Sequence, residues 1–317
     1  MRRFLSGVLA AILMLSLCAC GGNTAPAVTQ PSTTEAVTEP TVDPNYDPVN
    51  KDKTLKVLAI GNSFSVDTTH FLEDIARAHG FETVLLGNLY IGGCTLETHA
   101  LNVTENLPAY KFYMNYTGEW VSIEACTIEY ALKNQDWDII TMQQASTWSG
   151  KPETYEPYLT QLIEYVNENK TNPNARLAWN MTWAYQSDFV KDMFAQYDRN
   201  QDVMYKAILS TVQGTVQAHK DFAYVMPCGT AIQNARTSYV GDTLTEDGYH
   251  MNELGRVITS YTWLATFLNE PLTEINITNV TDTLILTEQD KAMILESVNN
   301  AIKNPFAVTQ SQYTTAP

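Results

Sequence analysis

The sequence predicts an α/β domain in which a parallel, five-stranded sheet carries helices on both faces. Short apolar runs alternate with helical stretches throughout residues 51–305, and no internal repeat is visible. Strands that alternate with helices are typical of parallel sheets with right-handed crossovers. With 44% hydrophobic residues, the chain can also build a sizeable core. We therefore expect one three-layer, doubly wound domain.

Five apolar runs are the expected strands. Residues 55–60 form the first of them, and Gly61 stops it. A short apolar run bounded by a turn residue is typical of a buried strand. The other expected strands are residues 83–89, 137–142, 176–181 and 222–226.

Helical stretches separate these strands. The first is expected over about 66–79, where Phe71, Leu72, Ile75 and Ala76 recur at helical spacing. The others lie near residues 122–134, 155–169, 199–218, 252–268 and 287–302. Residues 306–317 are expected to form a C-terminal tail.

The first residues of the chain have the pattern of an export signal. Two arginines precede an apolar stretch, residues 4–17, that is too short to span a bilayer as a stable helix. The stretch ends in Leu17-Cys18-Ala19-Cys20, which resembles the lipobox of bacterial lipoproteins. This resemblance implies that residues 1–19 are a signal peptide and that lipidated Cys20 anchors an exported protein to the bacterial cell membrane or surface. The alternative is an ordinary secretory signal with two incidental cysteines.

Residues 20–50 differ in composition from the rest of the chain. They contain five of the thirteen prolines and show no aliphatic periodicity, so they cannot bury enough surface to order themselves. We expect a disordered tether rich in threonine and proline. A loosely packed N-terminal arm is the alternative.

The charge and cysteine content exclude several classes of protein. The formal net charge is −16, and cleavage after residue 19 would remove two arginines and give −16 − 2 = −18. Such a surplus of carboxylates argues against a nucleic-acid partner. The odd number of cysteines left, Cys94, Cys126 and Cys228, excludes complete pairing within one chain. We expect no cofactor and no metal site.

A serine follows the first expected strand. In doubly wound sheets the ligand cleft lies beyond the carboxyl ends of the strands, which is where Gly61-Asn62-Ser63 is expected. Taken alone, Ser63 could cap the next helix or act as a nucleophile.

A base and an acid for such a nucleophile occur together near the other end of the chain. Asp247 and His250 are three residues apart, so they can meet at one imidazole on a turn that leads into the next helix. Serine catalysis needs a base for the hydroxyl proton and an acceptor that orients the imidazole. Ser63, His250 and Asp247 would supply these roles.

These motifs resemble those of the SGNH/GDSL hydrolase superfamily of esterases and lipases. Gly61-Asn62-Ser63 matches its Gly-Asp-Ser or Gly-Asn-Ser turn, and Asp247-Gly248-Tyr249-His250 matches its Asp-x-x-His motif. Tyr90-Ile91-Gly92-Gly93-Cys94 stands where the superfamily has a glycine whose N–H helps to bind the oxyanion. The resemblance covers the whole domain in the right order. It implies a flavodoxin-like SGNH fold, a Ser-His-Asp triad, and oxyanion donors from the N–H groups of Ser63 and Gly93.

The third motif of the superfamily differs in this chain. Members carry Gly-x-Asn-Asp after the third strand, whereas this chain has Gln143-Gln144. A glutamine amide could replace the asparagine as an oxyanion donor, and the segment is similar to the Gln-Gly-Glu segment of carbohydrate acetylesterases. We expect Gln144 to take this role rather than Gln143, although strand alternation leaves either one open.

Polar and aromatic residues that follow the strands are expected to contact the substrate. They are Asn62, Gln143, Asn180 and Trp183. The resemblance implies a serine esterase, and we expect it to be a membrane-tethered monomer that removes O-acetyl groups from extracellular carbohydrate. The alternatives are a non-catalytic glycan-binding lipoprotein with the same fold, and a lipase or thioesterase.

Overall fold

The computed structural model describes residues 47, 49 and 53–316. The expected signal peptide, Cys20 and nearly all of the tether lie outside the described residues. Within them, no helix is long and apolar enough to cross a membrane. The thiols of Cys94, Cys126 and Cys228 are buried and free, in agreement with their odd number.

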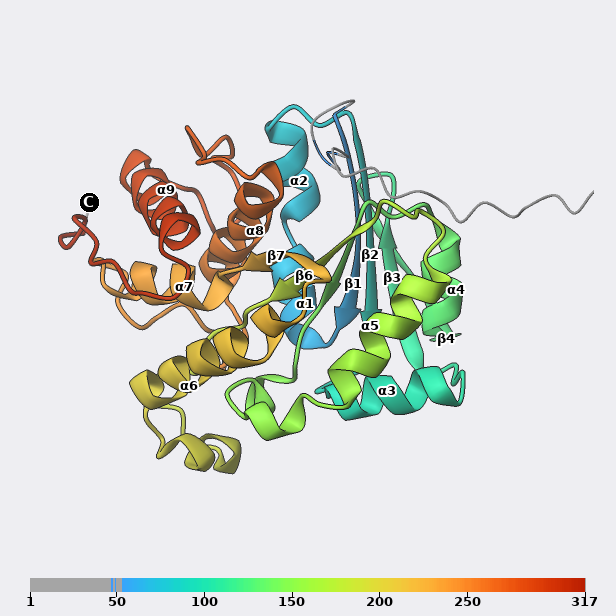
Figure 1. The fold of residues 1–317 in the computed structure, drawn as a ribbon. Coiled ribbons are helices and arrows are strands. Elements are labelled where there is room, and N and C mark those ends of the chain that lie inside the picture. The colour runs from blue at the N-terminus through green and yellow to red at the C-terminus, as the bar shows by residue number, and fades with distance from the viewer. Residues whose placement is uncertain (1–46, 48, 50–52, 317) are drawn as a thin grey trace, which may run out of the picture. The chain divides into compact units, whose positions relative to one another are not determined.

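A seven-stranded sheet forms the centre of the fold (Figure 1), with the strand order β4-β3-β2-β1-β5-β6-β7. β1 pairs in parallel with β2 and β5, β5 with β6, and β6 with β7. These five strands are the five that the sequence predicts. Their bounds are β1 Thr54–Gly61, β2 Thr83–Tyr90, β5 Ile139–Met142, β6 Arg176–Asn180 and β7 Phe222–Met226.

The prediction of an all-parallel sheet of five strands is wrong at one edge. β3 (Tyr110–Asn115) and β4 (Trp120–Cys126) extend the sheet by antiparallel pairing beyond β2. β4 is exposed over nearly its whole length, so it lacks the apolar run by which buried strands are recognised. The helix expected over 122–134 therefore begins only at α4 (Ile128–Asn134), which Thr127 caps.

The predicted helices are present, and one of them is split into two shorter helices. The stretch 66–79 folds as two short helices, α1 (Ser63–Thr69) and α2 (Leu72–Ala78), because the chain turns at residues 70–71. Four further predicted helices are α5 Tyr158–Asn169, α6 Gln201–Gly214, α8 Glu253–Leu268 and α9 Glu288–Lys303. The sequence did not predict α3 Leu96–Thr104 and α7 Cys228–Arg236.

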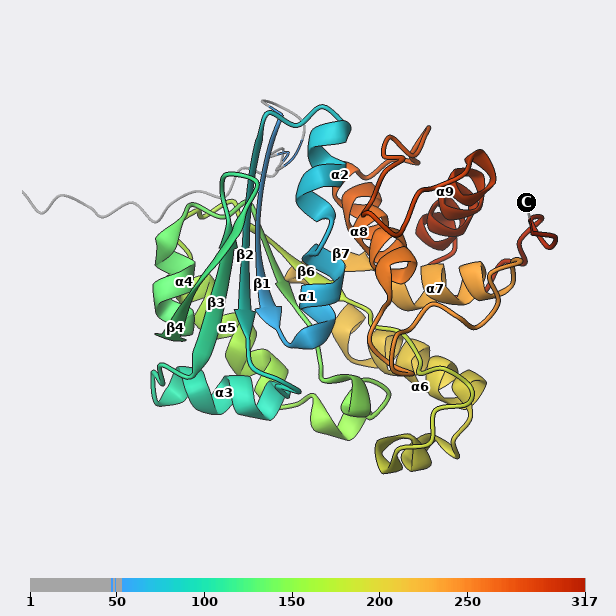
Figure 2. The ribbon, with the colours of Figure 1, turned by 180° about the vertical axis from the view of Figure 1, so that it is seen from behind.

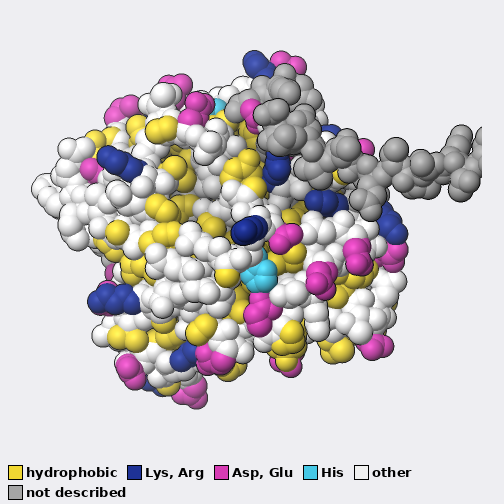
Figure 3. All heavy atoms as spheres, viewed as in Figure 1, with side chains coloured by type: hydrophobic (Ala, Val, Ile, Leu, Met, Phe, Trp, Pro, Cys, Tyr) yellow, Lys and Arg dark blue, Asp and Glu magenta, His cyan; other side chains and the backbone are white. Residues whose placement is uncertain are grey.

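Helices cover both faces of the sheet, as the doubly wound class requires. α1, α2, α7, α8 and α9 lie together on one face, and α3, α4 and α5 lie on the other (Figures 1 and 2). The apolar side chains between these layers form a continuous buried core. Acidic and basic side chains are interspersed on the side of the molecule shown in Figure 3.

The expected C-terminal tail is part of the domain. The Thr309 N–H donates to Asn234 Oδ1 at 2.7 Å, and the Tyr239 N–H donates to the Tyr313 carbonyl at 2.8 Å. Ser311 is 9% exposed. Residues 306–316 therefore pack against α7 and the loop that follows it.

Gly87 in β2 leaves room for the rings of Phe112 in β3 and of Trp137, which precedes β5. A Cβ atom at this position would lie 2.8 Å from the Trp137 ring and 2.9 Å from the Phe112 ring. We expect Gly87→Val to lower the free energy of unfolding by about 1–3 kcal/mol, because the core is overpacked. Chemical denaturation measures this change.

Gly214 provides the matched control for Gly87. It ends α6, and a Cβ atom there would meet nothing within 4 Å. Gly214→Ala is expected to keep or slightly raise the stability. A Gly87→Val protein as stable as the Gly214→Ala protein would contradict the packing argument.

Candidate active site

Ser63 is the first residue of α1 and is separated from the end of β1 by Asn62 alone. The residue that caps α1 is Asn62, whose Oδ1 accepts the Phe64 N–H at 3.0 Å. The Ser63 hydroxyl is therefore not needed as a cap. Gly61 makes the tight turn possible, because a Cβ atom there would lie 2.6 Å from Ser65 Oγ.

Ser63, His250 and Asp247 lie together. His250 Nε2 is 2.8 Å from Ser63 Oγ, although the two residues are 187 positions apart in the sequence. His250 Nδ1 is 2.8 Å from Asp247 Oδ2. Asp247 Oδ1 accepts the N–H groups of Tyr249 at 3.1 Å and of His250 at 2.8 Å. The three residues have the connectivity that a nucleophile, a base and an orienting carboxylate require.

Asp247 is held in its charged form. Burial favours the neutral carboxyl, but hydrogen bonds from the backbone and ring of His250 and from the Tyr249 N–H outweigh burial and lower the pKa of Asp247. A carboxylate accepts only, so the hydrogen-bond network assigns the imidazole proton to Nδ1. Nε2 is then free to accept the hydroxyl proton of Ser63.

The loop that carries Asp247 and His250 is held in place by contacts with the segment 183–189. Gly248 has φ +93°, and a Cβ atom there would lie 2.4 Å from the Phe189 ring. Its carbonyl accepts the Gln186 N–H at 2.8 Å. On the next residue, the Tyr249 carbonyl accepts the Trp183 indole N–H at 2.7 Å.

Trp183 is not a substrate-binding residue in this structure, so that expectation is wrong. Its side chain is 0% exposed and stacks on Phe64, with ring centroids 4.2 Å apart and an interplanar angle of 5°. Because the same indole binds the Tyr249 carbonyl, Trp183 joins the helix of Ser63 to the loop of His250.

A buried ion pair makes a second connection between α1 and this loop. Asp67 accepts the Met251 N–H at 2.9 Å and Arg256 Nε at 2.9 Å. Burial raises the pKa of Asp67 even though the Met251 N–H and the Arg256 charge act against it. Met251 follows His250 directly, so the ion pair holds the base near Ser63.

Two backbone N–H groups are available to an oxyanion. Ser63 and Gly93 line one cavity, and within the described part of the chain neither N–H has a hydrogen-bond partner. Gly93 has φ +63°, which lets the loop after β2 turn there. Asn62 Nδ2 donates to the Cys94 carbonyl at 3.1 Å, so this loop is tied to the turn that carries Ser63.

Gln144 does not supply an oxyanion donor, which corrects the prediction. Its Nε2 donates to Thr154 O at 3.0 Å and to Thr154 Oγ1 at 3.1 Å. Its Oε1 accepts the N–H groups of Leu96 at 3.0 Å and Ala145 at 2.9 Å. Both amide protons and the amide oxygen are thus used within the protein.

Gln143 and Asn180 are also structural, contrary to the expectation that they contact the substrate. Each is 1% exposed, and Asn180 Nδ2 donates to Gln143 Oε1 at 2.8 Å. Gln143 Nε2 donates in turn to Asn62 Oδ1 at 2.8 Å, and Trp263 Nε1 donates to Asn180 Oδ1 at 3.2 Å. This buried amide relay, Trp263–Asn180–Gln143–Asn62, ends at the Cys94 carbonyl. Asn62 lines the cavity, but it is only 1% exposed, and its amide accepts two hydrogen bonds and donates one within the protein.

The cavity at Ser63 has a volume of about 370 Å³. Its walls contain side chains that the sequence did not single out: the aromatic Tyr90, Trp148 and Tyr249, the hydroxyl-bearing Ser146 and Thr147, and Met193. Ser146, Thr147 and Trp148 follow β5 within six residues. The rule that chemistry lies beyond strand ends could therefore have found them, but no motif distinguishes them.

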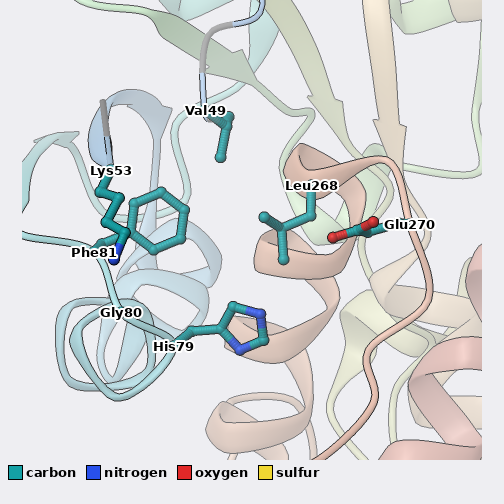
Figure 4. A pocket seen from close by; sticks show the side chains of 7 residues that line it. All are labelled: Val49, Lys53, His79, Gly80, Phe81, Leu268 and Glu270. Atoms are coloured by element: carbon teal, nitrogen blue, oxygen red, sulfur yellow. The ribbon is translucent and has the colours of Figure 1, made fainter. Parts of the chain in front are cut away.

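The cavity shown in Figure 4 lies at the opposite end of the sheet. It measures about 200 Å³ and is lined by Lys53, which precedes β1, together with His79 and Glu270. No serine or cysteine lines it. Among the described residues, no group of three or more His, Cys, Asp or Glu side chains is placed to hold a metal ion.

The chain is similar to proteins of one family. The family model described as a domain of unknown function, DUF4886, matches residues 56–282. The crystal structure of a DUF4886 family protein from Bacteroides uniformis ATCC 8492 is 36% identical with a TM-score of 0.77. It covers 83% of this chain and 100% of its own. No curated protein sequence matches.

More distant structural matches are weak. One, from Slackia heliotrinireducens, is provisionally described as an SGNH hydrolase; it is 19% identical with a TM-score of 0.46, covering 67% of this chain and 98% of its own. A catalytic mutant of an acetylxylan esterase from Geobacillus stearothermophilus is 11% identical with a TM-score of 0.44. The match covers 67% of this chain and 94% of the esterase chain. The resemblance to SGNH hydrolases therefore rests on the motifs and geometry of this chain.

The Asp67–Arg256 ion pair makes a test of stability possible. Arg256→Ala would leave a buried carboxylate unpaired, so we expect the free energy of unfolding to fall by about 2–3 kcal/mol at pH 8. The raised pKa of Asp67 means that protonation favours the folded state, so stability is regained as the pH falls. Denaturation at pH 8 and pH 5 should show a smaller loss at pH 5.

An exposed ion pair serves as the control for Arg256. Lys206 pairs with Asp202 on the surface of α6, and its side chain is 72% exposed. Lys206→Ala should leave the stability near that of the parent at both pH values. An equal loss at pH 5 and pH 8 for Arg256→Ala would refute the role assigned to the ion pair.

Proposed function

The chain belongs to the DUF4886 family, whose description leaves its reaction open, and we propose that it is a serine hydrolase of carboxylic esters. The observation that carries this proposal is the pair of 2.8 Å contacts that link Ser63 to His250 and His250 to Asp247. A serine hydroxyl becomes a useful nucleophile when a base that is itself oriented accepts its proton. The cavity above Ser63 admits a substrate to this group.

In the first half of the reaction, Ser63 Oγ attacks the carbonyl carbon of the ester. His250 Nε2 takes the hydroxyl proton, and Asp247 stabilises the imidazolium that forms. The N–H groups of Ser63 and Gly93 donate to the oxyanion of the tetrahedral intermediate. The intermediate collapses as the C–O bond to the alcohol breaks, and the alcohol leaves with the proton from His250. The acyl group stays on Ser63.

In the second half, water replaces the alcohol. His250 Nε2 takes a proton from the water as its oxygen attacks the acyl carbon, and the same N–H groups bind the new oxyanion. The bond to Ser63 Oγ breaks, His250 returns the proton to this oxygen, and the carboxylic acid leaves. The enzyme regains its starting state without a cofactor.

Carbohydrate that carries O-acetyl groups is the substrate we favour. The cavity combines aromatic walls, Tyr90 and Tyr249, with the hydroxyl groups of Ser146 and Thr147. Aromatic faces next to hydrogen-bonding groups suit a sugar ring better than a long acyl chain. A protein exported and tethered through lipidated Cys20, as the N-terminal sequence suggests, would meet such polymers outside the cell.

Two measurements separate this proposal from its alternatives. A lipase or thioesterase would hydrolyse nitrophenyl esters of long acyl chains faster than the acetate, whereas an acetylesterase rejects chains beyond a few carbons. A glycan-binding protein without turnover would bind sugars but show no serine-dependent hydrolysis.

Replacement of the nucleophile tests the proposal directly. We expect Ser63→Ala to lower kcat/KM for 4-nitrophenyl acetate at least about 1000-fold and to abolish labelling by a fluorophosphonate probe. Ser210→Ala, at an exposed serine of α6, should leave both unchanged. Residual labelling of the Ser63→Ala protein would show that another nucleophile reacts.

Replacement of the orienting carboxylate tests the assigned tautomer. Asp247→Asn keeps the side-chain size but removes the charge that stabilises the imidazolium, so we expect kcat to fall about 10⁴-fold with KM little changed. Asp282→Asn is the control, because Asp282 is an exposed aspartate that does not line the cavity at Ser63. Steady-state kinetics in which both variants match the parent would remove Asp247 from the mechanism.

A further inference from the structure

Trp148 is an exposed tryptophan between two cavities. It ends the 3-10 helix Ser146–Trp148 after β5 and is 40% exposed. Among the described residues its ring makes no aromatic contact, unlike that of Trp183. A large aromatic ring left on the surface at a cavity mouth is a common contact for a ligand.

The second cavity adjoins the candidate active site through this one side chain. Trp148 lines both the 370 Å³ cavity at Ser63 and a neighbouring cavity of about 330 Å³. The N-cap residue of α3, Thr95, and Glu97 in its first turn line the neighbouring cavity, and the segment 153–158 contributes Glu153 and Tyr158. A ligand that extends past Trp148 from Ser63 would therefore enter this cavity.

The walls of the second cavity are held in place before any ligand arrives. The Gln144 amide donates twice to Thr154, which also lines the cavity. The Tyr158 hydroxyl donates to Glu97 Oε1 at 2.9 Å. The Lys151 N–H donates to the Trp148 carbonyl at 2.9 Å. Because these side chains are already ordered, they lose less conformational entropy when a ligand binds.

The charged side chains that line the second cavity are all acidic. Glu97 and Glu153 line it, and no lysine or arginine does. In the described part of the chain, Glu153 has no hydrogen-bond or ion-pair partner, so its carboxylate can accept from a ligand. Carboxylates accept hydrogen bonds from hydroxyl groups but repel an anion.

We propose that this second cavity binds the sugar unit next to the acylated one, and that it selects a neutral unit over an anionic one. The ring of this unit lies against the Trp148 indole, and its hydroxyl groups donate to Glu97 and Glu153. The substrate is thus an oligosaccharide or polymer of neutral sugars rather than of uronic acids. This assignment rests on the proposed esterase function, with the acylated unit at Ser63.

The test compares a neutral and an anionic substrate of equal length. We would measure kcat/KM for O-acetylated cellotetraose and for O-acetylated tetragalacturonate, each relative to 4-nitrophenyl acetate. The parent should prefer the neutral tetrasaccharide at least about tenfold. The double variant Glu97→Gln with Glu153→Gln should reduce this preference about tenfold, because the amides no longer repel the uronate groups.

A control and a second readout make the outcomes distinct. Glu164→Gln, at an exposed glutamate of α5 outside both cavities, should keep the preference of the parent. If Ser63-dependent hydrolysis of 4-nitrophenyl acetate is normal but the parent does not prefer the neutral substrate, the second cavity is not the proposed subsite, while the esterase function stands. Absence of any Ser63-dependent hydrolysis would overturn the function itself.

Binding can be measured without turnover. Calorimetric titration of cellotetraose into the Ser63→Ala protein should give a dissociation constant that Trp148→Ala raises at least about tenfold, and tetragalacturonate should bind more weakly than cellotetraose. Equal affinity with and without the Trp148 ring would overturn the proposed subsite whatever the catalytic activity.

Discussion

The candidate site depends on one buried amide, the side chain of Asn62. Its Oδ1 accepts the Phe64 N–H and the Gln143 amide, and its Nδ2 donates to the Cys94 carbonyl. One side chain thus joins the turn after β1 to the loop after β2 and to the end of β5. Buried polar groups are costly unless they are paired, so this junction disfavours arrangements of the three loops that would break these hydrogen bonds. Ser63 and Gly93, which line the same cavity, belong to two of those loops.

The base reaches the nucleophile because separate contacts hold its loop to α1. Trp183 stacks on Phe64 and binds the Tyr249 carbonyl, while Asp67 binds the Met251 N–H and Arg256. These contacts flank His250 on both sides in the sequence. Ser63 and His250 are 187 positions apart, so no shared helix or turn can hold them together. The contacts on either side of His250 do so instead. The side chains that surround the reacting groups therefore serve mainly to position them.

The sequence predicted the five central strands and most helices because their burial leaves periodic apolar patterns. It missed β3 and β4. β4 is an exposed edge strand with no buried face to mark it, whereas β3 alternates the buried Tyr110 and Phe112 with half-buried residues, a pattern that could have been recognised. Among the site residues, Asp247 and His250 could be paired because their spacing is local. Gln144 and Trp183 were misassigned, because the direction of a buried amide or indole depends on partners such as Thr154 and Tyr249 that only the fold brings near. Trp148 carried no motif at all.

By itself, the sequence determined the fold class, the order of the motifs along the chain, and the types of group available for chemistry. These properties follow from local periodicity and from residue identity, which can be read along a single chain. Only the tertiary structure decided which amides are consumed in the relay, which N–H groups remain free, and which aromatic ring faces the solvent between two cavities. Those outcomes depend on hydrogen bonds and packing between residues far apart in sequence, and each donor that is already satisfied is lost to a ligand.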